Sequence, residues 1–223
     1  MDDARQVCDA EPPVAELTFR CLRVTPDPNA ASPTLVVRLG LTETTGADVH
    51  AVVLRCQIQL EPHRREYADH EVEAVGCMLG DRTGRDAESE PLRFGFATQT
   101  VSSFTGSTEV DLPVPCSYDL EVAANQYMYA LDGGVAPLLL LFSGTVFTTS
   151  ATGLSVHPVA RDSSARFSMP VSVWRAAMDL HFPGKAWLRL RRETFDALHR
   201  YRARRGLLTW DDAVERLLKE AAP

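Results

Sequence analysis

The chain has 223 residues, of which 45% are hydrophobic and 24% charged, a composition typical of a globular protein with its own core. No apolar run approaches the roughly 20 residues that span a bilayer, and the first residues lack the basic region and apolar stretch of a secretory signal, so we expect a cytoplasmic protein. The net charge of −7 is uneven: residues 170–223 hold 11 Lys and Arg against 7 Asp and Glu, and the preceding residues hold 12 against 23, which disfavours non-specific binding of nucleic acid by the whole molecule.

The first 13 residues are polar and end in two prolines, and we expect them to form a disordered tail. After them, apolar and polar residues alternate with the period of a half-buried strand. The clearest case is residues 49–60, where mostly apolar side chains share one face and Arg55, Gln57 and Gln59 share the other. The expected strands are residues 17–21, 34–42, 49–60, 92–97, 104–112, 118–131 and 135–148.

The connections between these strands favour antiparallel pairing. Residues 132–134, Asp-Gly-Gly, are a strong hairpin signal because glycine tolerates positive φ. Residues 61–90 form a charged excursion with one helical turn near residues 72–78. About seven short strands with little helix predict a mainly β fold, an antiparallel β-sandwich that is immunoglobulin-like in the broad sense, over residues 14–160. A barrel is the alternative.

The predicted C-terminal segment, residues 161–223, is rich in helix. Its expected elements are a helix over residues 171–182, a strand over residues 186–191, and helices over residues 192–205 and 210–221. Gly206 is expected to end the second helix, and Thr209 to cap the start of the third.

Signatures of catalysis are weak. The sequence contains no G-x-S-x-G nucleophile elbow and no glycine-rich phosphate loop. Glu66, Asp69, Glu71 and Glu73 could be read as a carboxylate pair, but a solvated loop is the simpler interpretation. We therefore predict a protein that is not an enzyme, with no catalytic residues and no cofactor.

A metal site is also not favoured. The five cysteines are scattered and form no C-x-x-C pair. Cys56, His63, His70 and Cys77 recur at intervals of seven, but structural zinc sites use tighter pairs, so solvated loop histidines are the preferred interpretation.

Tyr127, Tyr129 and Asn125 would share one face of the strand predicted at residues 118–131. They could form an exposed recognition surface, but we favour tyrosines with polar tips packed in the core.

The end of the chain resembles a ribbon-helix-helix module. The matching residues are 187–191, Thr194, Phe195, Leu198, 205–210 and 213–218. Such modules pair two strands across a dimer and read the major groove of DNA, which here would use Trp187, Arg189 and Arg191. In the alternative, this basic segment packs against an acidic surface and does not read DNA.

A second resemblance covers nearly the whole chain. Residues 53–60, 104–107, 120–124, 140–144 and 170–174 resemble an uncharacterised actinobacterial family associated with gene clusters for nickel-iron hydrogenases. This resemblance implies an accessory role in the maturation, assembly or structure of such an enzyme. We therefore predict a protein partner, with hydrogenase subunits as candidates, ahead of nucleic acid. The predicted partner-binding residues are Arg189, Arg191, Arg192, Arg204 and Arg205.

Overall fold

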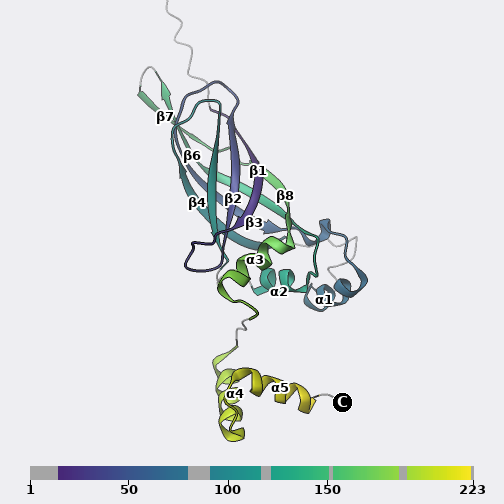
Figure 1. The fold of residues 1–223 in the computed structure, drawn as a ribbon. Coiled ribbons are helices and arrows are strands. Elements are labelled where there is room, and N and C mark those ends of the chain that lie inside the picture. The colour runs from purple at the N-terminus through teal and green to yellow at the C-terminus, as the bar shows by residue number, and fades with distance from the viewer. Residues whose placement is uncertain (1–14, 80–90, 117–121, 151–152, 186–189, 222–223) are drawn as a thin grey trace, which may run out of the picture. The chain divides into compact units, whose positions relative to one another are not determined.

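The computed structural model describes residues 15–79, 91–116, 122–150, 153–185 and 190–221. The chain divides into two compact units, Met1–Pro183 (unit 1) and Gly184–Pro223 (unit 2). All the strands that the structure describes belong to unit 1 (Figure 1). No helix within the described ranges is long and apolar enough to cross a membrane.

The first sheet of unit 1 has three antiparallel strands in the order β1-β2-β5. Its strands are β1 (Leu17–Pro26), β2 (Thr34–Glu43) and β5 (Ser107–Pro115). In β2, Leu35, Val37, Leu39 and Leu41 are buried, while the residues between them are half-buried. This period of two is the pattern of a sheet that covers the core with one face.

The second sheet has the order β4-β3-β6-β7, and β8 pairs with β6 as well. Its strands are β3 (Val49–Leu60), β4 (Leu92–Val101), β6 (Val135–Ser150), β7 (Gly153–Pro158) and β8 (Ser164–Pro170). The strand predicted at residues 49–60 has the same bounds in the structure. The apolar run at residues 138–142 lies in β6, an inner strand of this sheet, and Leu139 and Leu141 in it are half-buried.

The buried faces of the two sheets form one hydrophobic cluster. Phe19 of β1 stacks on Phe142 of β6, with ring centroids 4.3 Å apart and an interplanar angle of 15°. Burial of large side chains of this kind is the main favourable term in folding. The prediction of a mainly antiparallel β protein followed by C-terminal helices is confirmed.

Gly144 allows β6 to serve two partner strands. Residues 135–141 of β6 pair with β8, and residues 145–150 pair with β7. Gly144 lies between these stretches with φ +147, and a Cβ there would overlap the carbonyl oxygen of Val53 in β3. Only glycine combines this backbone conformation with such a close approach of the neighbouring strand.

The helices of unit 1 cluster at one end of the sheets (Figure 1). They are η1 (Pro62–Arg64), α1 (Asp69–Leu79), α2 (Val122–Ala130) and α3 (Val171–His181). The excursion at residues 61–90 thus contains a full helix, α1, where one turn was predicted. The helix predicted at residues 171–182 is confirmed as α3.

The predicted strand at residues 118–131 is wrong, because its described part forms the helix α2. The buried residues Ala124, Tyr127, Met128 and Leu131 recur at helical spacing and face the core. The alternating tyrosines suggested a period of two, but the helical period decides the structure. The Asp-Gly-Gly turn therefore joins a helix to β6, and Gly134 takes a positive φ of 68.

Strands β7 and β8 were not predicted. Both are short. In β7 the apolar residues Leu154 and Val156 are exposed, whereas in β8 Ala165, Phe167 and Met169 face the core in a period of two that is only seven residues long. Because β8 pairs with β6 and α3 buries Trp174 and Ala177, these elements belong to unit 1. The unit boundary falls after Pro183, whereas the sequence suggested a boundary after residue 160.

Unit 2 contains the helices α4 (Arg192–Arg205) and α5 (Trp210–Ala221), with the predicted bounds. Gly206 ends α4 in the left-handed conformation, with φ 64. Thr209 caps α5: its Oγ1 accepts the Asp212 N–H at 3.0 Å, and the Asp212 carboxylate accepts the Thr209 N–H at 3.1 Å. Most of the strand predicted at residues 186–191 lies outside the described residues, and Arg191 is the residue that precedes α4.

Candidate functional site

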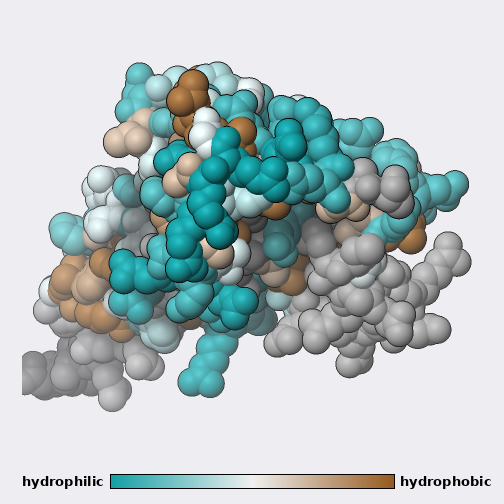
Figure 2. Space-filling model, turned by 90° about the horizontal axis from the view of Figure 1, so that it is seen from below, coloured by the Kyte–Doolittle hydropathy of each residue, from teal (hydrophilic) through white to brown (hydrophobic). Residues whose placement is uncertain are grey.

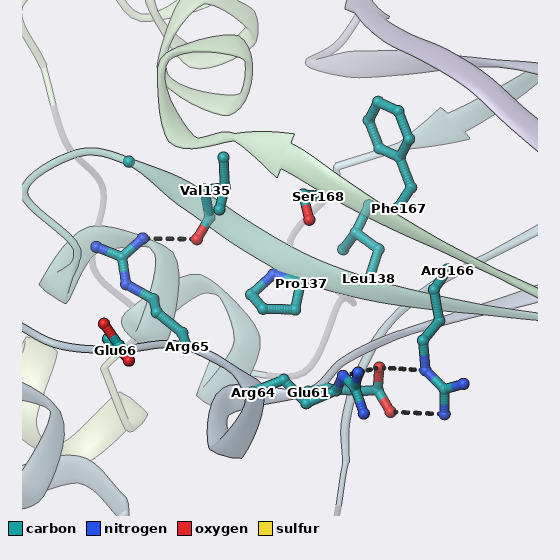
Figure 3. Close-up of a pocket in the computed structure, with 11 residues that line it drawn as sticks. Glu61, Arg64, Arg65, Glu66, Val135, Pro137, Leu138, Arg166, Phe167 and Ser168 are labelled. Atoms are coloured by element: carbon teal, nitrogen blue, oxygen red, sulfur yellow. Dashed lines mark hydrogen bonds and ion pairs between the residues drawn. The ribbon is translucent and has the colours of Figure 1, made fainter.

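A pocket of about 540 Å³ lies in unit 1, between η1 and the paired strands β6 and β8 (Figure 3). Its charged wall consists of Glu61, Arg64, Arg65, Glu66 and Arg166. The remainder of the lining is Gly134, Val135, Pro137, Leu138, Phe167 and Ser168. Small-molecule sites commonly combine a few polar groups with apolar walls in a volume of this order.

Glu61 organises one end of the pocket. Its backbone N–H donates to the carbonyl of Pro137 at 3.0 Å, which ties the end of β3 to β6. The carboxylate is buried and accepts two hydrogen bonds from Arg166, from Nε at 3.0 Å and from Nη2 at 3.4 Å. Arg64 Nε lies 3.6 Å from the same carboxylate. Two guanidinium groups therefore share one carboxylate, which leaves a surplus positive charge at this end (Figure 3).

Arg65, which lines the pocket, forms a second ion pair with Glu71 of α1. Arg65 Nη2 donates to Glu71 at 2.6 Å, and Arg65 Nη1 donates to the Val135 carbonyl at 2.6 Å. Both side chains are less than a tenth exposed. The Glu71 carboxylate also accepts the backbone N–H groups of Asp132 and Ala68. This pair joins α1 to the turn before β6, and so fixes the shape of the pocket.

The pKa of Glu71 reflects this environment. Burial alone raises the pKa, but the hydrogen bonds from Arg65 and from the two backbone N–H groups, with the charge of Arg65, outweigh burial and lower the pKa from 4.5 to about 2. The prediction of a solvated acidic loop is therefore wrong for Glu71. Glu66, Asp69 and Glu73 are exposed, as that prediction requires.

Behind the pocket, two tyrosines link η1 to α2. The Tyr67 hydroxyl donates to the Pro62 carbonyl at 2.8 Å, so the Tyr127 hydroxyl donates to Tyr67 at 2.9 Å. Burial raises the pKa of both phenols. The core interpretation is confirmed for Tyr127, which is fully buried, whereas Tyr129 is half exposed and packs edge-on against Trp174.

The residues weighed as metal ligands do not form a cluster. Cys56 is buried in the core, and burial raises the pKa of its thiol to about 12. His63 and His70 are exposed, and His70 Nε2 lies 3.5 Å from the Asp132 carboxylate. The side chain of Cys77 is outside the described part of the chain. Within that part, no three His, Cys, Asp or Glu side chains are arranged to hold a metal ion.

The predicted partner-binding arginines belong to unit 2. Arg191, Arg192, Arg204 and Arg205 are exposed, and Arg189 lies outside the described residues. Arg205 pairs with Glu220 of α5 at 3.2 Å, so part of its charge holds the two helices together.

The two helices of unit 2 pack through a small aromatic cluster. The ring of Trp210 lies 5.2 Å from that of Phe195, and the Arg202 guanidinium lies 4.0 Å from the Trp210 centroid. Ala213 is the one buried residue among those described in unit 2.

Large apolar side chains of unit 2 remain exposed. Leu208 is 89% exposed and Leu218 is 66% exposed. Phe195, Val214 and Leu217 are also exposed. On the molecular face drawn in Figure 2, hydrophobic residues reach the surface in a few separate groups within a mostly hydrophilic surround.

Residues 14–223 match the family model DUF6084, which is described as a family of unknown function. The chain belongs to the DUF6084 family. A comparison with curated proteins finds no match. Among solved structures, this DUF6084 chain is similar to the putative ApaA protein from Bordetella pertussis, with 12% identity, a TM-score of 0.26, and coverage of 71% of this chain and 98% of that chain. A likeness this distant supports no statement about function.

The pocket residues Glu61, Arg64, Arg65 and Arg166 were not predicted from the sequence. One local signal was present: Arg64 and Arg65 come within five residues of the end of the clearest predicted strand, with Pro62 between, so they were expected near a strand end. No such signal exists for Arg166, because its position depends on the unpredicted pairing of β8 with β6.

Proposed function

We propose that this DUF6084 protein is a non-enzymatic interaction protein, in which an immunoglobulin-like sandwich carries a C-terminal helical hairpin that binds a partner protein. The observation that carries the proposal is the exposure of Leu208 and Leu218 in a unit with a single buried residue among those described. Exposed apolar side chains of this size are typical of protein interaction surfaces.

The pattern of α5 supports this function. Trp210, Ala213, Val214, Leu217 and Leu218 recur at the spacing of one helix face. Helix α4 packs against Trp210 and Ala213, which leaves the rest of the face without cover from the described part of unit 2. A pair of helices of this length buries too little surface to be strongly stable alone, and a partner would supply the missing burial.

The charge of α4 suggests what the partner looks like. The helix contains Arg192, Arg200, Arg202, Arg204 and Arg205 against two acidic residues. We therefore propose a partner protein with an apolar groove bordered by acidic residues, because complementary charge at the rim of an interface increases the association rate and selects the partner. The sequence resemblance adds hydrogenase subunits as the first candidates.

The test is a co-purification from native cells with the full-length tagged protein. The double variant Leu208→Ser/Leu218→Ser should recover about tenfold less of the partner, or even less, because two apolar side chains that contact it are removed. The matched control is Leu154→Ser/Val156→Ser, which changes two exposed apolar residues of β7 in unit 1. Equal recovery of partners by both variants would contradict the proposal.

The second candidate, a DNA-binding regulator, rests on the exposed arginines of α4 and on Arg191. It predicts binding of duplex DNA that weakens steeply with salt and falls when Arg191 and Arg192 are changed to alanine. Such binding, measured by fluorescence anisotropy, would identify DNA as the partner in place of a protein. Absence of binding at low salt would remove this candidate.

A further inference from the structure

Arg64 and Arg166 place unused hydrogen-bond donors at the pocket of unit 1. A guanidinium group carries five N–H donors. Arg166 uses Nε and one Nη2 hydrogen on Glu61, and Arg64 directs Nε toward the same carboxylate. The Nη groups that remain, on two side chains about half exposed, are free to bind a second anion.

The arrangement is built before any ligand arrives. Glu61 is held by its backbone hydrogen bond to Pro137, and its buried carboxylate fixes both guanidinium groups (Figure 3). The two arginines outnumber the carboxylate by one charge. A second carboxylate between them would complete the charge balance and form charge-assisted hydrogen bonds.

The remainder of the pocket restricts the ligand further. Val135 and Pro137 provide an apolar part of the lining, whereas the side chain of Phe167 points away from Arg166 and packs against the core (Figure 3). Glu66 also lines the pocket, and a second negative charge on the ligand would be repelled there. The Nε of Arg65, in the same wall, is a buried donor without an acceptor among the described residues.

From these features we infer that the pocket binds a monocarboxylate with a short apolar body, whose carboxylate is held by Arg64 and Arg166. All the residues of this site belong to unit 1, so the inference goes beyond the proposed function and is tested independently of it. Arg64 and Arg166 contact the ligand in this account, and Glu61 positions them.

The test uses hexanoate as the probe and the full-length protein, with amide NMR shifts as the readout. Titration with hexanoate should change the chemical shifts of amides that line the pocket, and the change should saturate. The dissociation constant should be on the order of 1 mM, as expected for a ligand of this size. Hexan-1-ol, which keeps the apolar body and lacks the charge, should bind at least about tenfold more weakly, and so should the dicarboxylate adipate. A short peptide ending in leucine tests whether the carboxylate belongs to a chain terminus: tighter binding of the peptide or of hexanoate assigns the source, and either result supports the site.

Arg166→Ala and Arg64→Ala should each weaken the binding of hexanoate by about tenfold. Arg161→Ala is the matched control, because Arg161 is exposed in the connection between β7 and β8 and does not line the pocket. Ser168→Phe keeps every charge and fills the pocket, so it should also block binding with an unchanged melting temperature. The inference is overturned if hexanoate gives no saturable shifts, if hexan-1-ol binds equally well, or if Arg161→Ala weakens binding as much as Arg166→Ala.

Discussion

The buried pair of Arg65 and Glu71 should make a measurable part of the stability dependent on pH. Because the pKa of Glu71 is about 2 in the folded chain and 4.5 ordinarily, the unfolded chain binds more protons between these values. The pair therefore stabilises the fold fully above pH 4.5, and this contribution is lost as the pH falls toward 2. At about 1.4 kcal/mol for each tenfold change in proton affinity, it amounts to about 3 kcal/mol.

The perturbation is Glu71→Gln, which removes the charge and leaves the Arg65 guanidinium buried without its counter-ion. Urea unfolding at about pH 7 should give a loss of about 3 kcal/mol relative to the parent protein. The difference should shrink as the pH falls below 4.5, since Glu71 of the parent then becomes protonated in the unfolded chain. Glu66→Gln is the control, and because Glu66 is exposed it should change stability by less than about 0.5 kcal/mol. A difference that stays constant across this pH range would refute the reasoning.

Three further substitutions test the fold. Gly144→Ala should destabilise unit 1 by at least about 3 kcal/mol in urea unfolding, because the new Cβ overlaps the Val53 carbonyl; a loss below about 1 kcal/mol would contradict the account of β6. Glu43→Ala should lower the free energy of unfolding by about 2 to 4 kcal/mol, since this buried carboxylate accepts hydrogen bonds from N–H groups of the turn that follows β2. An unchanged free energy of unfolding would show that other groups accept these hydrogen bonds. Thr209→Ala should cost α5 about 1 kcal/mol, seen as faster amide hydrogen exchange in its first turn; protection equal to that of the parent would argue against the cap.

The sequence predicted those elements whose burial pattern is local. Strand β3 alternates from Val52 to Leu60, and α4 and α5 have distinct ends at Gly206 and Thr209, so the bounds of all three were predicted correctly. In α2, the aromatic alternation of Tyr127 and Tyr129 competed with the helical spacing of the buried residues, and the wrong period was chosen. Periodicity arguments are weakest for short segments in which both patterns fit.

The candidate pocket could not be predicted, because it is made by pairing between distant parts of the chain. Glu61 and Arg166 are 105 residues apart, and they meet only because β8 pairs with β6 beside η1. In β8, Ala165, Phe167 and Met169 alternate with exposed residues, but a period of two over seven residues does not reveal which strand β8 pairs with. Burial of Glu71 likewise follows from the position of Arg65 and of the turn at Asp132, and its charged surroundings in the sequence suggested a solvated loop.

The exposed apolar residues of unit 2 are tested most directly by site-specific photo-crosslinking in native cells. A photo-reactive amino acid in place of Leu208 or Leu218 should form a covalent adduct with one partner protein. The same amino acid in place of Leu154, which is exposed on β7, should not form that adduct. Adducts to the partner from position 154 but not from positions 208 and 218 would contradict the proposal that the C-terminal hairpin binds it.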